Sequence, residues 1–301
     1  MKSKATSVSC KLVMAAALVV AATFGAQVAS GQVTKPAAEG KVESQESANK
    51  QSLAVMRTFA DTIQVTVGEG EQSKEAKLIP EPLFRFSDPS RTFSDGSVWA
   101  WTITARPVVM TEFNCGDRNK RRWGHDLVAT SDVRVSAAVA GYGRWAPRES
   151  DFKLQPVPEF PPPAKTEAGR LRQMKQFARS LSGSEEWQNQ RSELRLLPTE
   201  VYRYSDVESG LLDGAAFVFA VGSNPEAILF VEVHKTDSGE RSWKYGLARM
   251  SAAAVTFRLG DTEVWAVPQT FGSLSTAYHA FSRAVPAARA PDVDTLKKAS
   301  E

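Results

Sequence analysis

A stretch that occurs twice constrains the fold of this chain more than any other feature. The segment LIPEPLFRFSDPSRTFSDGSVWAWT begins at Leu78, and the segment LLPTEVYRYSDVESGLLDGAAFVFA begins at Leu196. The matched residues lie 118 positions apart, and they include charged, small and proline residues as well as aromatic ones. Self-similarity at a fixed spacing marks a repeated structural unit. The sequence therefore predicts that two copies of one fold follow each other along the chain.

The spacing between matched residues changes to 120 in the later part of each copy. The run VVMTEF then matches ILFVEV, which aligns Glu112 with Glu232. The same spacing aligns Trp123 with Trp243. We place the two-residue difference at the connection near Pro107, because surface connections tolerate insertions better than strands do.

Each copy opens with a helical pattern and continues with strands. Apolar residues recur at steps of three and four in the first copy, at Leu53, Met56, Phe59, Ala60 and Ile63. The second copy repeats them at Leu171, Met174, Phe177, Ala178 and Leu181. Beyond these residues the apolar period changes to two, which is typical of half-buried strands. The predicted fold class is α+β, with two tandem repeats that each pack an N-terminal helix on an antiparallel β-meander sheet.

These patterns divide the chain into segments. Residues 50–148 form repeat 1 and residues 168–268 form repeat 2. The Pro-rich stretch between them, 149–167, favours a stiff linker. The polar stretch 32–49 is typical of a flexible spacer. We expect a loose tail over 269–301, with a short helix in LSTAYHAFSRA.

The first 31 residues have the layout of a secretory signal peptide. A lysine-rich start precedes the apolar run 12–24, and small residues follow it. The run is too short to cross a membrane comfortably, so no stable span is expected once the leader is removed. Removal takes three lysines and no acidic residue, which lowers the formal charge from +3 to about zero. We expect an exported protein, periplasmic or secreted, and no nucleic-acid partner, because that partner needs a strongly basic face.

The residue types that carry most enzyme chemistry are sparse. His125 aligns with Tyr245 and His234 aligns with Asn114, so neither histidine recurs in the other copy. The sequence contains no CxxC, HExxH or GxSxG motif and no phosphate-binding glycine loop. Cys115 is the only cysteine beyond the leader, which excludes an internal disulfide. We predict no metal site and no cofactor.

Aspartates are the best remaining candidates for chemistry. Asp88 and Asp95 recur as Asp206 and Asp213, seven residues apart in each copy. Asp95 and Asp213 each precede a glycine, and Asp-Gly pairs favour tight turns. A structural role in a loop and turn is the simpler interpretation. The alternative is a carboxylate-dependent, hydrolase-like enzyme that uses Asp95 or Asp213 as its acid or base.

An arginine and a glutamate also recur on predicted strands. We expect a structural ion pair on one sheet face in each copy, Arg85 with Glu112 and Arg203 with Glu232. Such pairs fix strand register more surely than they add stability.

Several segments carry a family resemblance. They are the leader, the helical LxxM stripe, LLPTEVYRYSD, DGAAFVFAVGSNPEAILFVEV and WKYGLARM. With these, the chain resembles uncharacterised exported proteins of planctomycete-type bacteria, most strongly over the second copy. The resemblance implies export and a shared fold. It implies no catalytic residue, because the group has no assigned activity.

Large aromatic side chains on the predicted strands indicate a binding surface. The candidates for stacking against a ligand are Trp99, Trp101, Phe217, Phe219, Trp123 and Trp243. The expected function is that of a non-enzymatic binding or interaction protein of the cell envelope. Its partner would be an envelope protein, a peptide or a hydrophobic ligand.

Overall fold

The computed structural model describes residues 38–88, 93–115, 122–236 and 238–284. The predicted signal peptide (1–31) lies outside these residues. The chain divides into two compact units, 1–43 and 44–301, and the description that follows concerns the second unit.

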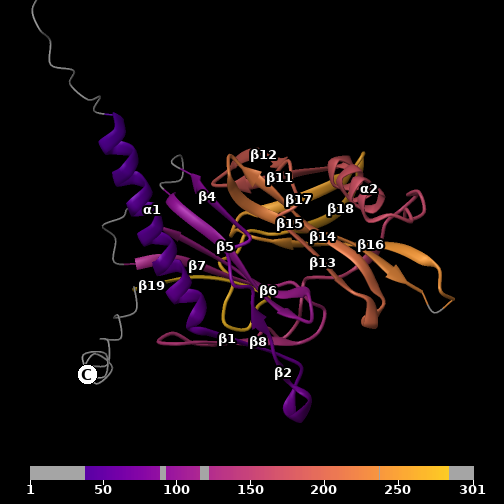
Figure 1. The fold of residues 1–301 in the computed structure, drawn as a ribbon, viewed down its shortest axis with the longest axis horizontal. Helices are drawn as coiled ribbons and strands as arrows, with labels where there is room; N and C mark the ends of the chain where they lie inside the picture. The colour runs from indigo at the N-terminus through magenta and orange to yellow at the C-terminus, as the bar shows by residue number, and fades with distance from the viewer. Residues whose placement is uncertain (1–37, 89–92, 116–121, 237, 285–301) are drawn as a thin grey trace, which may run out of the picture. The chain divides into compact units, whose positions relative to one another are not determined.

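The fold is mostly β, with two helices and three antiparallel sheets, one of which is a curled half-barrel. Helix α1 spans Ala38–Asp61 and helix α2 spans Glu167–Ser180 (Figure 1). The prediction that a helix precedes each sheet region is confirmed. Helix α1 begins inside the stretch 32–49 that the sequence predicts as a flexible spacer. Helix α2 begins after Thr166, whose side chain accepts a hydrogen bond from the amide of Gly169 and so caps the helix.

The first half of the unit, which contains α1 and strands β1 to β9, builds two of the sheets, and β19 (Tyr278–Ala284) from the end of the chain completes one of them. One has the strand order β2-β1-β8-β9, and the other has the order β19-β7-β6-β5-β3 with β4 paired to β5. The strands of this half are β1 (Ile63–Val67), β2 (Lys74–Glu75), β3 (Lys77–Leu78), β4 (Phe84–Asp88), β5 (Phe93–Ile103), β6 (Arg106–Cys115), β7 (Arg122–Ala129), β8 (Val135–Val139) and β9 (Gly143–Trp145).

The second half forms one nine-stranded sheet of order β10-β16-β15-β14-β12-β11-β17-β18, with β13 paired to β14. Its strands are β10 (Gln155–Pro156), β11 (Leu181–Trp187), β12 (Gln190–Leu196), β13 (Tyr202–Asp206), β14 (Leu211–Val221), β15 (Asn224–Lys235), β16 (Arg241–Arg249), β17 (Ala254–Leu259) and β18 (Thr262–Val267). The sheet is more than the predicted meander, because β17 returns to pair with β11 and adds a second hairpin at that edge.

The ladders of the two halves have matching registers. Thr66 pairs with Glu75 as Ser184 pairs with Glu193, each 118 residues further along. The long hairpins β5–β6 and β14–β15 keep this spacing throughout. The change to 120 therefore falls after β6, and the predicted position near Pro107 is wrong. A shift of two residues leaves every side chain of a strand on the same face, so alternation could not detect the error.

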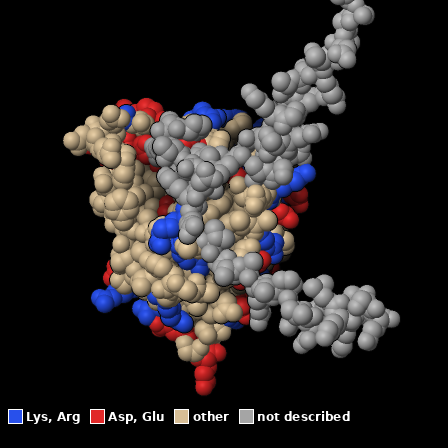
Figure 2. Space-filling view, turned by 90° about the vertical axis from the view of Figure 1, so that its left-hand side faces the viewer, with Lys and Arg blue, Asp and Glu red and all other residues tan. Residues whose placement is uncertain are grey.

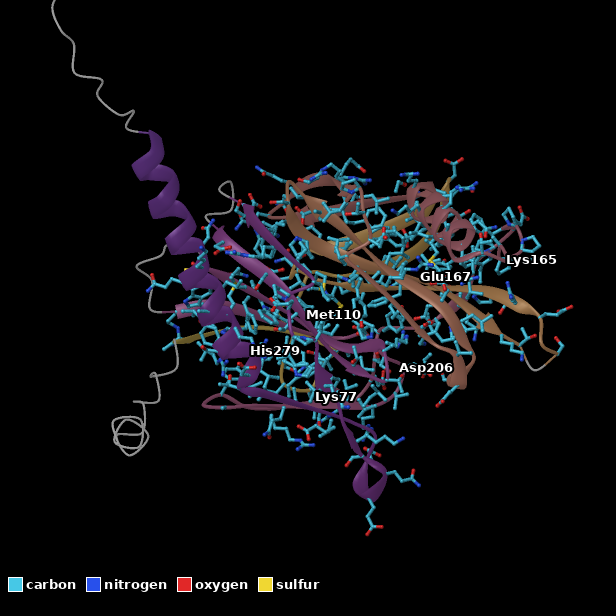
Figure 3. All side chains as sticks on the ribbon, viewed as in Figure 1. Lys77, Met110, Lys165, Glu167, Asp206 and His279 are labelled. Carbon is cyan, nitrogen blue, oxygen red and sulfur yellow. The ribbon has the colours of Figure 1, made fainter. Side chains whose placement is uncertain are left out.

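Three clusters of apolar side chains hold the unit together. In two of them a helix covers one face of a long hairpin: Met56 and Phe59 contact the first hairpin, and Met174 and Phe177 contact the second. The third cluster joins the opposite faces of the two hairpins and contains Met110, labelled near the centre of Figure 3. Each hairpin is therefore buried on both faces, by a helix on one side and by the other half on the other.

The two halves exchange their outermost strands. After β9 the chain crosses over and adds β10 to β16 of the second half. After β18 it crosses back as β19 (Tyr278–Ala284), which pairs along its whole length with β7 of the first half. The stretch 149–167 is thus not only a linker, since Phe152 is buried and Pro161 accepts a hydrogen bond from the Trp243 indole. Residues 278–284 are neither a helix nor a loose tail, because they form a strand that pairs with β7 at the sheet edge.

The surface charges are mixed on one face of the molecule. On the face that Figure 2 shows, lysine and arginine side chains are interspersed with acidic and uncharged residues. Neither α1 nor α2, the helices of the described residues, has the length and apolar content of a membrane-spanning segment.

Candidate functional site

The two aspartates proposed for chemistry lie inside strands and are held by arginines. Arg85 binds Asp95 with an N–O distance of 2.5 Å, and Asp95 is buried. Asp213 accepts hydrogen bonds from Arg203 at 2.9 and 3.0 Å and from Arg170 at 2.7 Å. A buried carboxylate that is already paired with guanidinium groups is poorly placed to exchange a proton with a substrate.

The glycines that follow these aspartates do not make turns, which corrects the prediction. Gly96 lies within β5, and a Cβ there would overlap the ring of Phe86. Gly214 lies within β14 under the ring of Tyr204 in the same way. The Asp-Gly pair thus combines a buried acid with a position where a ring from the neighbouring strand covers the backbone.

The other recurring aspartate has the structural role that the simpler interpretation gives it. Asp206 caps the short 3-10 helix Val207–Ser209 by accepting a hydrogen bond from the amide of Ser209. It also accepts a hydrogen bond from Thr104 at 2.8 Å (Asp206 is labelled in Figure 3). The hydrogen bonds from Thr104 and Ser209 lower the pKa of Asp206. Its counterpart Asp88 is buried at the end of β4.

The predicted ion pairs within each copy do not form. Arg85 lies on β4 and Glu112 on β6, with β5 between them. Arg203 and Glu232 are separated by β14 in the same way. Each arginine is bound instead by the aspartate of the adjacent strand, because a neighbouring strand is the nearest source of a carboxylate.

Glu232 pairs instead with an arginine from the first half. The guanidinium of Arg106 lies 2.7 Å from Oε1 of Glu232, which is fully buried. Tyr204 donates a hydrogen bond to the same oxygen, and His234 hydrogen-bonds to Oε2, each at 2.7 Å. Burial acts to raise the pKa of Glu232, but the bonds to His234 and Tyr204 and the charge of Arg106 outweigh it and lower the pKa to about 2.

Aromatic rings enclose the cation of this pair. The guanidinium carbon of Arg106 lies 4.9 Å from the ring centroid of Phe152 and 5.7 Å from that of Phe230. Such contacts stabilise a desolvated guanidinium through the ring quadrupole. The ion pair, the two hydrogen bonds that Glu232 accepts from Tyr204 and His234, and the two rings together form a filled polar site between the halves.

The six aromatic residues predicted to bind a ligand lie in the apolar cores. None exposes more than 6% of its surface: Trp99, Trp101, Phe217, Phe219, Trp123 and Trp243. All six belong to the two helix-covered clusters, and the indoles of Trp99 and Trp243 also donate hydrogen bonds to Ser97 and to the carbonyl of Pro161. The expected stacking surface therefore does not lie at these residues.

The histidines are dispersed. The ring of His125 is buried between Phe59 and Phe113, in the core position that Tyr245 has in the second half. Burial lowers the pKa of His125 to about 2. His279, on β19, hydrogen-bonds to the hydroxyl of Tyr142 at 2.7 Å. Within the described part of the chain, no three histidine, cysteine or acidic side chains are grouped to hold a metal ion.

A cavity of about 760 Å³ lies where segments of both halves meet, and we call it the acidic cavity. Its walls come from β6, β7, the β11–β12 hairpin, the turn between β14 and β15, the stretch after β16, Phe271 and the start of β19. Its acidic and amide lining residues are Glu112, Asn114, Asp126, Glu185, Gln188, Gln190 and Asn224. In the described residues no lysine or arginine lines it.

Hydrogen bonds organise the polar wall of the acidic cavity. Asn114 donates to Glu112 at 2.9 Å, and Tyr278 donates to Asp126 at 2.8 Å. Burial raises the pKa of Asp126 to about 7, against the opposing effects of the Tyr278 hydroxyl and the charge of Arg249. Asn224 is 3% exposed, and its Oδ1 has no hydrogen-bond partner among the described residues. Buried polar atoms are usually satisfied, so an acceptor without a donor beside a cavity is notable.

An aromatic pair forms another side of the acidic cavity. Trp187 and Phe271 meet edge to face with their centroids 5.9 Å apart, and 58% of Phe271 is exposed. Trp187 stands at the β11–β12 turn, where Gln188 and Asn189 both have positive φ, as in the tight turns of hairpins.

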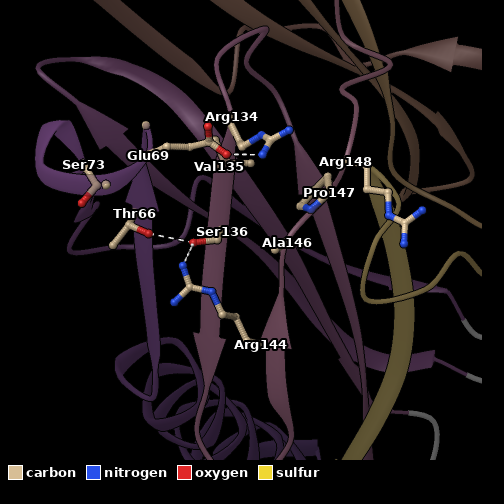
Figure 4. A pocket seen from close by; sticks show the side chains of 12 residues that line it. Thr66, Glu69, Ser73, Arg134, Val135, Ser136, Arg144, Ala146, Pro147 and Arg148 are labelled. Atoms are coloured by element: carbon tan, nitrogen blue, oxygen red, sulfur yellow. Dashed lines mark hydrogen bonds and ion pairs between the residues drawn. The ribbon is translucent and has the colours of Figure 1, made fainter.

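A second concavity, the arginine groove, has the opposite charge (Figure 4). It measures about 540 Å³ and is lined by Arg134, Arg144 and Arg148 together with hydroxyl side chains. Arg134 is paired with Glu69, and Arg144 donates to Ser136 at 2.8 Å. All three arginines are exposed, so the cationic wall of the groove is solvated, although the hydroxyl residue Ser136 that also lines it is buried.

Sequence reasoning named Glu112 and missed the rest of the acidic cavity. Its residues come from distant segments, and none of them belongs to a motif. Comparisons of the chain with protein-family models, with curated proteins and with solved structures give no match.

Proposed function

We propose that this chain is an exported, non-enzymatic binding protein of the cell envelope that holds a small ligand in the acidic cavity. The observation that carries the proposal is the cavity itself. Its volume of about 760 Å³ is that of a typical ligand site, and it combines an aromatic side with a few buried polar groups. The aromatic surface is provided by Trp187, Phe271 and Tyr278 in place of the six strand residues expected from the sequence.

The hydrolase alternative finds no support at its two aspartates. Asp95 and Asp213 are both bound by arginines inside strands. A general acid or base has to reach a substrate proton, and these carboxylates are occupied by structural partners.

Ligand-dependent stabilisation tests the binding proposal. A chemically diverse set of small molecules is screened for compounds that raise the melting temperature of the purified chain, as a ligand of the native state must. Ala252→Trp places a large side chain at the wall of the acidic cavity, and Ala138→Trp, on an exposed position of β8, is its matched control. We expect stabilising compounds to act on the control variant and to lose their effect on Ala252→Trp. Equal effects on both variants would place binding elsewhere.

Export rests on the sequence of residues 1–31. A reporter phosphatase that is active only outside the cytoplasm, fused behind residue 40, is expected to be active in cells. A variant in which two leucines of the apolar run are replaced by arginine provides the control and should be inactive.

We also infer that the two halves are copies of one unit, as their matching ladder registers suggest. Exchange of a residue for its counterpart tests this. Phe86→Tyr introduces the residue found at Tyr204, and Asn114 lies where Glu232 accepts the tyrosine hydroxyl in the second half. We expect a stability change below about 1 kcal/mol, as for a well-accommodated swap. A loss of several kcal/mol would contradict the equivalence.

A further inference from the structure

The filled polar site and the acidic cavity lie at equivalent positions of the two halves, and they differ in the residues at those positions. Arg106 and Asn224 each begin the second strand of the long hairpin of their half, so they occupy equivalent positions. Asn114 faces Gly96 as Glu232 faces Gly214, so these two residues are also equivalent. In the second half, therefore, a short amide replaces the long cation that reaches across from the first half.

The surrounding residues correspond as well. Glu112 pairs with Val98 as Phe230 pairs with Ala216, so a carboxylate stands where a ring covers the guanidinium in the filled site. Tyr278 corresponds to Phe152. Tyr278 stands at the start of the exchanged strand β19, and Phe152 shortly precedes the other exchanged strand, β10. Asn224, Asn114, Glu112 and Tyr278 all line the acidic cavity. The open space thus lies at the place that corresponds to an arginine side chain.

The lining of the acidic cavity suits a cationic ligand. Glu112, Asp126 and Glu185 contribute carboxylates to its wall. The exposed ring of Phe271 and the indole of Trp187 offer the kind of aromatic surface that encloses Arg106 in the filled site. The unpartnered Oδ1 of Asn224 adds an acceptor for an N–H donor.

From this correspondence we propose that the acidic cavity binds a guanidinium group supplied by a ligand. The proposal rests on the proposed function, since it names the class of ligand for the same cavity. A guanidinium has five N–H donors in a planar fork, which suits a wall that offers carboxylate and amide oxygens beside aromatic rings. The group would come either from a free alkylguanidine or from an arginine side chain of a peptide.

Calorimetric titration of the full chain tests the proposal with three probes. They are n-butylguanidinium, the neutral isostere n-butylurea, and the blocked tripeptide Gly-Arg-Gly. We expect n-butylguanidinium to bind at least tenfold more tightly than n-butylurea. Tighter binding of the tripeptide indicates a peptide ligand, and weaker binding indicates a free guanidino compound; both support a guanidinium site.

Isosteric variants assign the binding to the acidic cavity. Glu112→Gln and Asp126→Asn each remove a charge at nearly constant volume, and both are expected to weaken n-butylguanidinium binding at least tenfold. Glu263→Gln, an exposed acid on β18, should leave the affinity unchanged. Melting temperatures of the free variants show whether each is folded, and Asp126→Asn alone suffices if Glu112→Gln does not fold.

The possible failures are distinguishable. Equal affinity for n-butylurea, or unchanged affinity in the folded variants, overturns the guanidinium assignment. If other compounds still stabilise the chain and lose their effect on Ala252→Trp, the binding function stands with a different ligand class. If no compound stabilises the chain and loses that effect on Ala252→Trp, the proposed function fails as well.

Discussion

Arg106 and Glu232 lie 126 residues apart in the chain, and a 2.7 Å ion pair joins them between the two halves. The carboxylate is completely buried and the guanidinium is nearly so. Charges removed from water in this way stabilise a protein only while both partners remain. The pair therefore fixes which groups of the two halves must meet.

Removing the cation is expected to be costly. Arg106→Met leaves the Glu232 carboxylate buried without its arginine partner, which should lower the free energy of unfolding by about 3–5 kcal/mol. The double variant Arg106→Met/Glu232→Leu removes both charges and should recover most of that loss. Urea unfolding of the single and double variants measures the coupling between the two residues. A loss below about 1 kcal/mol in Arg106→Met would show that the pair is unimportant for stability.

Acid should weaken the same pair. The pKa of Glu232 falls from 4.5 to about 2 on folding, so its contribution is complete above pH 4.5 and is lost as the pH falls towards 2. The contribution is on the order of 3 kcal/mol. Urea midpoints measured from pH 7 down to pH 3 should fall less steeply for Glu232→Gln than for the unchanged chain. Glu263→Gln is the matched control, and its curve should follow that of the unchanged chain.

The covered glycines should not tolerate a side chain. Gly96→Ala places a Cβ against the ring of Phe86, which should destabilise the chain by about 1–3 kcal/mol. Gly214→Ala should have the same effect through Tyr204. In a Phe86→Ala background the added methyl group has room, so the further loss caused by Gly96→Ala should nearly vanish. Thermal unfolding of the four proteins of the Gly96–Phe86 cycle checks this, and an undiminished loss would mean that the ring is not the obstacle.

Guanidinium binding should depend on pH near neutrality. Burial raises the pKa of Asp126 to about 7, so the free carboxyl becomes ionised as the pH rises through 7. Affinity for n-butylguanidinium should therefore rise between pH 6 and 8, by at most about tenfold per pH unit for one titrating group. The other ionisable groups around it are Arg249, Glu112, Glu185 and Tyr278. In Asp126→Asn the dependence should disappear, and a dependence that persists would assign the titration to another group.

The stability of the unliganded protein should change with pH in the opposite direction to the ligand affinity. Because the folded chain holds the Asp126 proton more tightly than the unfolded chain does, this residue lowers stability as the pH rises from about 4 to 7. Asp126→Asn should remove that component. Ligand affinity and intrinsic stability are thus expected to change in opposite directions over the same pH range.

Local patterns predicted much of the fold, and non-local ones much less. The helical stripe at Met56 and Phe59 and the alternating strands were visible because helix and strand periods are properties of neighbouring residues. The strand β19 was missed because its partner β7 lies about 150 residues earlier and supplies the edge that makes it a strand. The Arg106–Glu232 pair was missed for a similar reason. Pattern matching aligned Glu232 with Glu112 instead, and a shift of two residues is invisible to a period of two.

The acidic cavity was beyond sequence reasoning for a different reason. Asn224, Trp187 and Phe271 belong to no sequence motif, and only the folding of distant segments places them around one space. The sequence pattern points instead to the tryptophans and phenylalanines of the strands. Large apolar residues at regular spacing are core residues far more often than ligand contacts, and here they fill the core.

The exchanged strands β10 and β19 have a consequence for how such a chain could arise. A lone copy of the unit would leave the outer edge of its own β7 or β16 uncovered, and open edges invite pairing with other chains. The strand able to close that edge would belong to a second molecule. If the halves are copies of one unit, as proposed above, the smallest self-sufficient ancestor would be a swapped homodimer, and duplication and fusion of its gene would turn a concentration-dependent partnership into a permanent one.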